Sequence, residues 1–95
     1  MEKVFKGIQT IAFHPSCYLD DFLEERNITF WDLIDGEEIS TNKMKKFMNG
    51  KIGVDSEIAY LLSKKLGTSI NLWINLQKRY KRKVIKAKKE LKRGY

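Results

Sequence analysis

Apolar residues recur at helical spacing along most of this chain. The first amphipathic segment has four of them at positions i, i+1, i+4 and i+5, namely Tyr18, Leu19, Phe22 and Leu23. The opposite positions carry carboxylates, which is typical of a solvated helix face. We therefore predict a helix that follows Pro15, has Ser16 as its N-cap and ends at Asn27.

Four more segments with this pattern follow, separated by short polar connections. Each is preceded by a residue that can act as an N-cap, in the order Thr29, Ser40, Asp55 and Ser69. Thr29 forms a capping-box pattern with Asp32, which stands where a Glu is usual. The stop signals are Asn49-Gly50 for the third helix and Gly67 for the fourth, whereas the fifth meets no breaker before Gly94.

Five helices without an alternating strand pattern predict an all-α domain of the helix-turn-helix kind. A chain of 95 residues can close one hydrophobic core and has no material for a second. We therefore expect an irregular N-terminal arm at 1–13, a helix-turn-helix domain at 14–77 and a basic helical extension at 78–95.

The fifth helix is predicted to keep one apolar stripe almost to its end. Its members are spaced three or four residues apart, in the order Trp73, Leu76, Tyr80, Val84, Ala87 and Leu91. Only the first half of such a long helix is expected to pack on so small a domain. The second half needs another surface, most simply the same helix of a second subunit or a partner protein.

Charge is distributed very unevenly. The chain has a net charge of +7, yet residues 78–93 alone carry ten Lys or Arg and a single acidic residue, Glu90. The rest of the chain is therefore slightly acidic. A basic tail on a near-neutral domain favours a polyanionic partner such as nucleic acid.

Other composition signals narrow the class of protein. No apolar run approaches the length of a membrane span, so no membrane role is expected. The single cysteine, Cys17, indicates a reducing compartment, which we take to be the cytoplasm. Cys17 and His14 have no further ligands for a zinc site, and no nucleophile arrangement or phosphate loop is present. We expect no metal, no cofactor and no enzymatic activity.

Residues 29–50 have the pattern of a helix-turn-helix, whose second helix lies across the major groove with its first residues at the base edges. The predicted DNA-binding residues are Ser40, Thr41, Asn42, Lys43, Lys45, Lys46 and Lys51. Asn42 can pair bidentately with adenine, and the lysines can meet phosphate or guanine. A lysine-rich solvated face on an ordinary core helix would give the same local pattern.

Several stretches between His14 and Gln77 resemble the HigA-type antitoxins of the lambda-repressor-like helix-turn-helix proteins. They are His14-Pro15, the segment 19–25 (LDDFLEE) followed by Asn27-Ile28-Thr29, Ile39-Ser40, Asn49-Gly50-Lys51, and the segment 66–77 (LGTSINLWINLQ). The last matches the LGTSxxxWxNLQ signature of that family.

This resemblance implies a dimeric repressor that binds an operator overlapping its own promoter and that neutralises a RelE-like ribonuclease toxin. The family's base-contacting positions fall on Thr41, Asn42, Lys43 and Lys45. Phe30 stands where the family has a polar DNA anchor, and Ile34 replaces a small residue. Gly36 is expected inside the supporting helix, and Glu38 replaces the usual turn glycine.

Two functions therefore remain open: operator binding with an altered turn, or an antitoxin-like or phage-encoded protein-binding module whose DNA binding is vestigial. A third, driven by the tail, is general coating of nucleic acid. The tail itself has three interpretations, which are a phosphate clamp beside the operator, a solvated tail, and a surface for an acidic protein. The predicted clamp residues are Lys78, Arg79, Lys81, Arg82 and Lys83.

Overall fold

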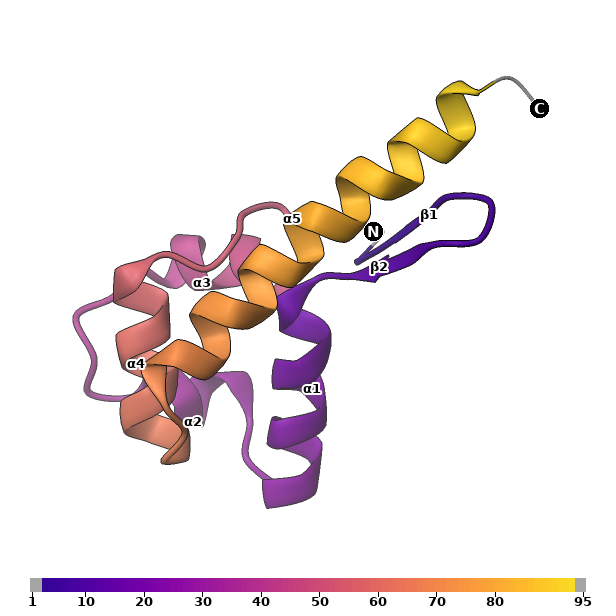
Figure 1. Ribbon diagram of the computed structural model, residues 1–95. Helices are drawn as coiled ribbons and strands as arrows, with labels where there is room; N and C mark the ends of the chain where they lie inside the picture. Colours follow the sequence, from indigo (N-terminus) through magenta and orange to yellow (C-terminus); the bar gives the residue numbers. More distant parts are fainter. Residues whose placement is uncertain (1–2, 94–95) are drawn as a thin grey trace.

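A computed structural model describes residues 3–93 and contains five helices and two short strands in that range. In chain order they are β1 (Val4–Lys6), β2 (Ile11–Phe13), α1 (Pro15–Arg26), α2 (Phe30–Ile34), α3 (Thr41–Met48), α4 (Ser56–Leu66) and α5 (Ile70–Lys92) (Figure 1). The predicted all-α five-helix class with a long last helix is confirmed. The first two residues of the predicted arm and the last two of the predicted extension, 1–2 and 94–95, lie outside the described residues. They include Gly94, the breaker expected after the fifth helix.

The core lies where α1, α3, α4 and the start of α5 meet. Trp73 and Phe47 are its largest fully buried side chains. Around them pack apolar residues of the helices, among them Leu19, Leu33, Met44, Ile58, Leu62 and Leu66. Burying this apolar surface fixes α3 against the domain, so that only one side of α3 faces solvent.

The helix caps follow the sequence signals with one exception. Thr29, Ser40, Asp55 and Ser69 each accept a backbone N–H of the following turn, as expected. The exception is α1, whose N-cap is His14 and not Ser16. The Ser16 N–H donates to Nδ1 of His14 at 3.0 Å, because Pro15 occupies the first helical position and moves the cap one residue earlier.

Gly36 does not interrupt α2, contrary to the expectation from the sequence. The helix ends at Ile34, and Gly36 follows in the connection with φ of 73°. Only glycine adopts this left-handed conformation without steric cost, so Gly36 supplies the turn that Glu38 could not. The changed residues therefore move the turn to Gly36 and do not weaken α2.

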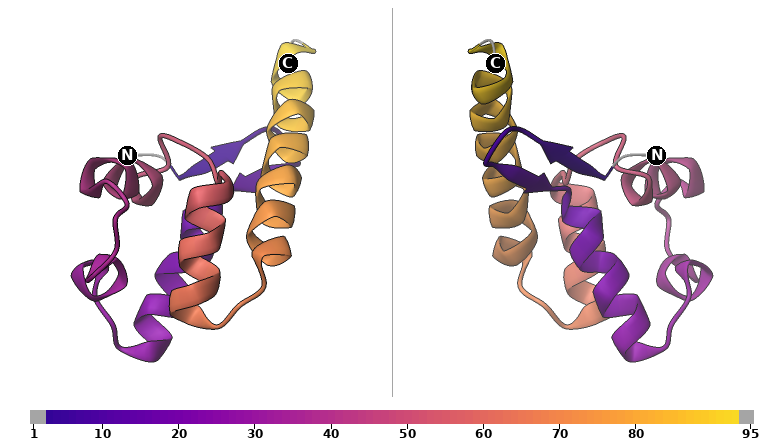
Figure 2. Two further views of the ribbon diagram at one scale, coloured as in Figure 1. Left: turned by 90° about the vertical axis from the view of Figure 1, so that its left-hand side faces the viewer. Right: turned by 90° about the vertical axis from the view of Figure 1, so that its right-hand side faces the viewer.

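The N-terminal arm is not irregular, and this corrects the prediction. Residues 4–13 form an antiparallel hairpin in which Val4 pairs with Phe13 and Lys6 with Ile11. Three-residue strands are too short to show the alternation by which strands are recognised in a sequence. Both strands pack on the C-terminal half of α5 (Figure 2).

One side of the second half of α5 is consequently covered by the hairpin of its own chain. Ala87 is fully buried, and an added Cβ on Gly7 would lie 2.7 Å from the Ala87 Cα. A glycine is therefore required where the hairpin crosses the helix. The expectation that this half needs a second subunit is wrong for Ala87, whereas Leu91 keeps half of its side chain exposed.

Candidate nucleic-acid interface

The exposed face of α3 is polar and basic. Met44 and Phe47 are fully buried and hold the helix in place. The residues that face solvent are Asn42, Lys45 and Lys46, together with Asn49, which caps the C-terminal end. The sequence of α3 contains no acidic residue. Asn49 was missed at the sequence level because it served only as a stop signal.

The predicted residues at the start of α3 have different exposures and contacts. The Ser40 hydroxyl accepts the Lys43 backbone N–H at 3.2 Å and so serves as the N-cap. Thr41 is half-buried, whereas Asn42 is exposed. Lys51 is exposed beyond the other end of the helix, where its backbone N–H donates to the Lys46 carbonyl at 2.8 Å.

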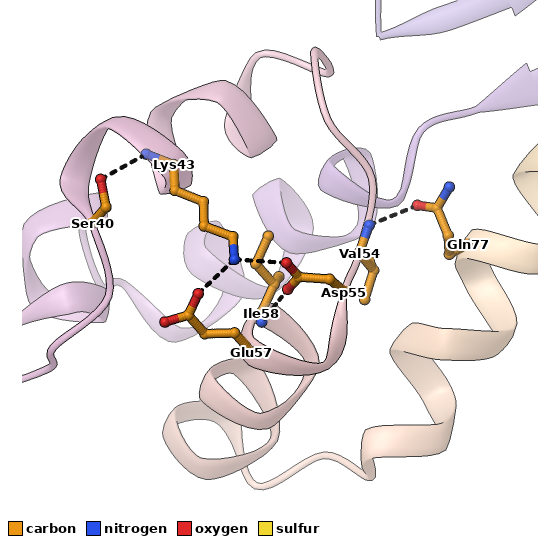
Figure 3. A network of polar contacts seen from close by, with 7 residues as sticks. All are labelled: Ser40, Lys43, Val54, Asp55, Glu57, Ile58 and Gln77. Atoms are coloured by element: carbon orange, nitrogen blue, oxygen red, sulfur yellow. Dashed lines mark hydrogen bonds and ion pairs between the residues drawn. The ribbon is translucent and has the colours of Figure 1, made fainter.

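The Lys43 side chain turns towards α4 and forms two ion pairs there (Figure 3). Its Nζ lies 2.6 Å from a carboxylate oxygen of Asp55 and 2.5 Å from one of Glu57. The hydrogen bond to Asp55, followed by that to Glu57, raises the pKa of Lys43. Lys43 therefore keeps its proton, and its charge is compensated within the chain.

Asp55 joins this ion pair to the start of α4. One of its carboxylate oxygens accepts the Ile58 backbone N–H at 2.9 Å, and the other pairs with Lys43. Partial burial raises the pKa of Asp55, but these two contacts outweigh burial and hold it below its usual value. The connection before α4 is also tied to α5, because Val54 donates its N–H to Gln77 Oε1 at 2.8 Å (Figure 3).

The carboxylates of α2 and the following turn are partly engaged within the domain. Glu37 pairs with Lys64 at 3.0 Å and with Lys65 at 3.3 Å. The Lys64 hydrogen bond is the main reason that the pKa of Glu37 is lowered. Asp32 accepts the Thr29 backbone N–H at 2.8 Å in the capping box. Glu37 is therefore paired with α4, and Asp32 is engaged by the N-cap residue of α2.

Trp31 lies at the edge of the α3 face and not in the core. Its side chain is 60% exposed. The Lys45 ammonium lies 5.4 Å from the centre of the indole ring. Phe30 packs against the same ring edge to face, with ring centres 5.2 Å apart.

The predicted clamp residues are on the middle turns of α5. Lys78, Arg79, Lys81 and Arg82 are exposed, and Lys83 is half-buried beside Phe13 and Tyr80. The last turns of α5 lie away from α3 (Figure 2). The clamp segment is closer to α3, because the His14 ring lies 5.3 Å from the Tyr80 ring of α5 and 5.3 Å from the Phe47 ring of α3.

Two further observations concern other kinds of site. Within residues 3–93, no three His, Cys, Asp or Glu side chains gather closely enough to hold a metal ion. Over the same residues, every helix is too short or too polar to cross a membrane.

Similar proteins share both the sequence pattern and the fold. No protein-family model matches the chain. A protein of Escherichia coli K12 described as the uncharacterized HTH-type transcriptional regulator YddM is 29% identical over 63 residues, which are 66% of this chain and 67% of that protein.

Solved structures extend the comparison to nearly the whole chain. PA4674 of Pseudomonas aeruginosa, crystallised with 18 base pairs of its operator DNA, superposes with a TM-score of 0.73 and 27% identity over 81% of this chain and 84% of its own. A Nostoc punctiforme protein described as a candidate antidote of a plasmid maintenance system gives a TM-score of 0.68 and 24% identity over 94% of each chain. The chain therefore has the fold of helix-turn-helix regulators.

Proposed function

We propose that this protein is a transcriptional regulator that binds double-stranded DNA in a sequence-specific manner, with α3 in the major groove. The observation that carries the proposal is the solvent-facing side of α3, which presents two amides and two lysines and no carboxylate. Its opposite side is locked into the core by Met44 and Phe47. A helix held in this way can offer its side chains to base edges in a fixed register.

The exposed residues of α3 would have distinct roles. Asn42, in the first turn, would pair bidentately with adenine, and Lys45 and Lys46 would contact guanine or phosphate. Ser40, Thr41 and Lys51 would position the helix on the backbone. Lys43 stays a predicted contact, but it would have to exchange its ion pairs with Asp55 and Glu57 for DNA.

The similar proteins support this proposal. PA4674 was crystallised with operator DNA of 18 and of 28 base pairs. The Escherichia coli relative is described as a transcriptional regulator. A protein with this role acts where bacterial DNA is, in the cytoplasm.

Substitution of Asn42 tests base reading directly. The affinity of Asn42→Ala for DNA from the region upstream of the gene should fall about tenfold, because one bidentate base contact provides about 1–3 kcal/mol. Fluorescence anisotropy with labelled duplexes measures the affinity. Asn71→Ala, on the exposed start of α5, removes an equally exposed amide outside α3 and should bind like the unchanged protein. Equal affinities for both variants would contradict base reading by α3.

The resemblance to HigA-type antitoxins supports a more specific role. In this role the protein forms a homodimer, represses its own promoter and neutralises a RelE-like toxin encoded beside it. The segment 66–77 carries the resemblance, and Trp73 within it is a core residue. Co-expression with the neighbouring gene, followed by measurement of the mass of the complex, tests both the dimer and the toxin.

A second candidate function is protein binding without operator recognition. One observation favours it: Ile11 and Phe13 lie on the outer face of the hairpin with 43% and 48% of their side chains exposed. Apolar side chains gathered on an outer surface are typical of protein interfaces. A stable complex with a neighbouring gene product, combined with no affinity for upstream DNA, would favour this function.

A further inference from the structure

The indole of Trp31 is exposed and has no role in the core. A tryptophan side chain has a large apolar area, and burying that area is favourable. An exposed tryptophan beside a candidate interface therefore indicates a surface that a partner covers. The ring is held from two sides, by Phe30 at its edge and by Lys45 above its face. Its remaining surface is open at the edge of the α3 face.

The contact with Lys45 couples Trp31 to α3. An ammonium over an indole face is stabilised by the ring electrons, which favours one position of the flexible lysine. Lys45 and Trp31 therefore form one small surface, in which a positive charge and an indole N–H donor lie next to an apolar ring. These are the groups that a sugar–phosphate backbone can use: a charge and a donor for the phosphate oxygens, and a flat apolar ring for the deoxyribose.

We propose that Trp31 contacts the DNA backbone beside the bases that α3 would read, with its indole N–H donating to a phosphate and its ring packing on a deoxyribose. This inference rests on the proposed DNA binding and assigns a positioning residue to it. The position of the Lys45 ammonium 5.4 Å from the Trp31 ring shows that Trp31 of α2 reaches the exposed face of α3, as this contact requires.

Charge favours DNA over a protein as the partner of this surface. Lys45 and Lys46 are exposed on α3, which lacks acidic residues. The acidic neighbour on α2 is Asp32, and its carboxylate is engaged by the backbone N–H of Thr29 at the start of that helix. Asp32 is held in this cap, whereas the charge next to the indole is the ammonium of Lys45.

The two tryptophans of the chain make a direct experiment available. Trp73 is fully buried and donates its indole N–H to Thr68 Oγ1 at 2.8 Å, so its emission serves as an internal reference. Saturation with operator duplex should change the emission of the unchanged protein. The same titration of Trp31→Phe should leave emission constant. Parallel anisotropy titrations with labelled duplex measure the affinity in both proteins.

Affinity and salt dependence separate Trp31 from its lysine neighbour. Trp31→Ala should weaken DNA binding about tenfold, as expected for loss of a hydrogen bond to a charged group, and Trp31→Phe should weaken it less. The salt slope is the slope of the logarithm of the binding constant against the logarithm of the salt concentration. Trp31→Ala should leave the magnitude of this slope unchanged, whereas Lys45→Ala should lower it by about one unit. Tyr60→Ala is the matched control, because Tyr60 is 61% exposed on α4 beside the acidic turn.

The outcomes are distinguishable. If the unchanged protein does not bind DNA, the proposed function fails before Trp31 is tested. If it binds and Trp31→Ala, shown to be folded by circular dichroism, binds equally well, the inference about Trp31 is wrong. It is wrong as well if DNA leaves the emission of the unchanged protein constant. It is also wrong if Trp31→Ala lowers the salt slope as Lys45→Ala does, or if it abolishes a protein complex while DNA affinity is unchanged.

Discussion

His14 shows how much one side chain can connect in a small domain. It caps α1, and its ring lies 5.3 Å from that of Phe47 on α3 and 5.3 Å from that of Tyr80 on α5. Because Nδ1 accepts the Ser16 N–H, the proton is on Nε2, which donates to the Ile52 carbonyl at 2.8 Å. Four separate parts of the chain meet at this neutral imidazole.

Replacing His14 should destabilise the fold in a pH-dependent way. His14→Ala leaves a cavity and an unpaired carbonyl, so the free energy of unfolding should fall by about 2–4 kcal/mol in urea denaturation near neutral pH. Burial lowers the pKa of His14, so the unfolded chain takes up the proton first. In the unchanged protein, this contribution to stability is complete above about pH 6.5 and declines as the pH falls below it.

His14→Gln is the matched control, because its amide can donate to Ile52 but does not titrate. It should regain part of the lost stability and lack the decline on the acid side. An unchanged pH profile in this variant would show that His14 does not set it. The sequence could not predict these contacts of His14, because those with Ile52 and Tyr80 join residues far apart in the chain.

At the scale of elements, the helices were predictable and the hairpin was not. Helix bounds follow from local signals, such as the cap at Ser40 and the left-handed Gly67. The hairpin depends on α5 instead. The Glu90 carboxylate accepts the backbone N–H groups of Ile8, Gln9 and Thr10 at 2.9–3.0 Å, and the Thr10 hydroxyl donates to it at 2.7 Å. Contacts across some 80 residues leave no local pattern.

Glu90, which stands alone among ten basic residues in the sequence, should therefore make hairpin docking sensitive to acid. The Thr10 hydroxyl, supported by the three backbone N–H groups, lowers the pKa of Glu90 to about 2. Its contribution is complete above the ordinary glutamate pKa of about 4.3 and is lost as the pH falls towards about 2. Hydrogen exchange at the amides of Ile8, Gln9 and Thr10 measures docking.

Glu90→Gln should reduce the protection of these amides near neutral pH, because the neutral amide is a weaker acceptor than the carboxylate. Glu25→Gln removes an exposed acid of α1 and should leave the hairpin protected. Full protection in Glu90→Gln would mean that apolar packing on α5 alone holds the hairpin.

At the scale of the whole molecule, the basic residues are divided between α3 and the length of α5. The sequence predicted both groups, α3 and the tail, but could not show that the last turns of α5 lie away from α3 (Figure 2). Their relative position depends on how α5 packs across α4 and α1, which no local signal encodes. Truncation of the tail would also remove Tyr80 and Ala87, which support His14 and the hairpin.

Charge substitution is therefore the appropriate test of the predicted clamp. Replacing four of the predicted clamp residues with glutamine should lower the salt slope of DNA binding by up to about four units if all four contact phosphates. The four residues are Lys78, Arg79, Lys81 and Arg82. The control neutralises four residues nearer the end of the helix, Lys86, Lys89, Lys92 and Arg93, which are equally exposed. Equal losses from both sets would indicate nonspecific attraction, and no loss from the first set would exclude the clamp.

The contact of Gly7 with Ala87 and Glu90 also bears on the order of folding. Residues 4–13 are synthesised well before α5, yet their docking surface is made of the last turns of that helix. Contacts so distant in sequence form late, because the intervening chain must first be ordered. Until α5 is complete the hairpin has no docking surface, so Phe5 and Ala12, on the face that α5 later covers, stay open to other apolar surfaces.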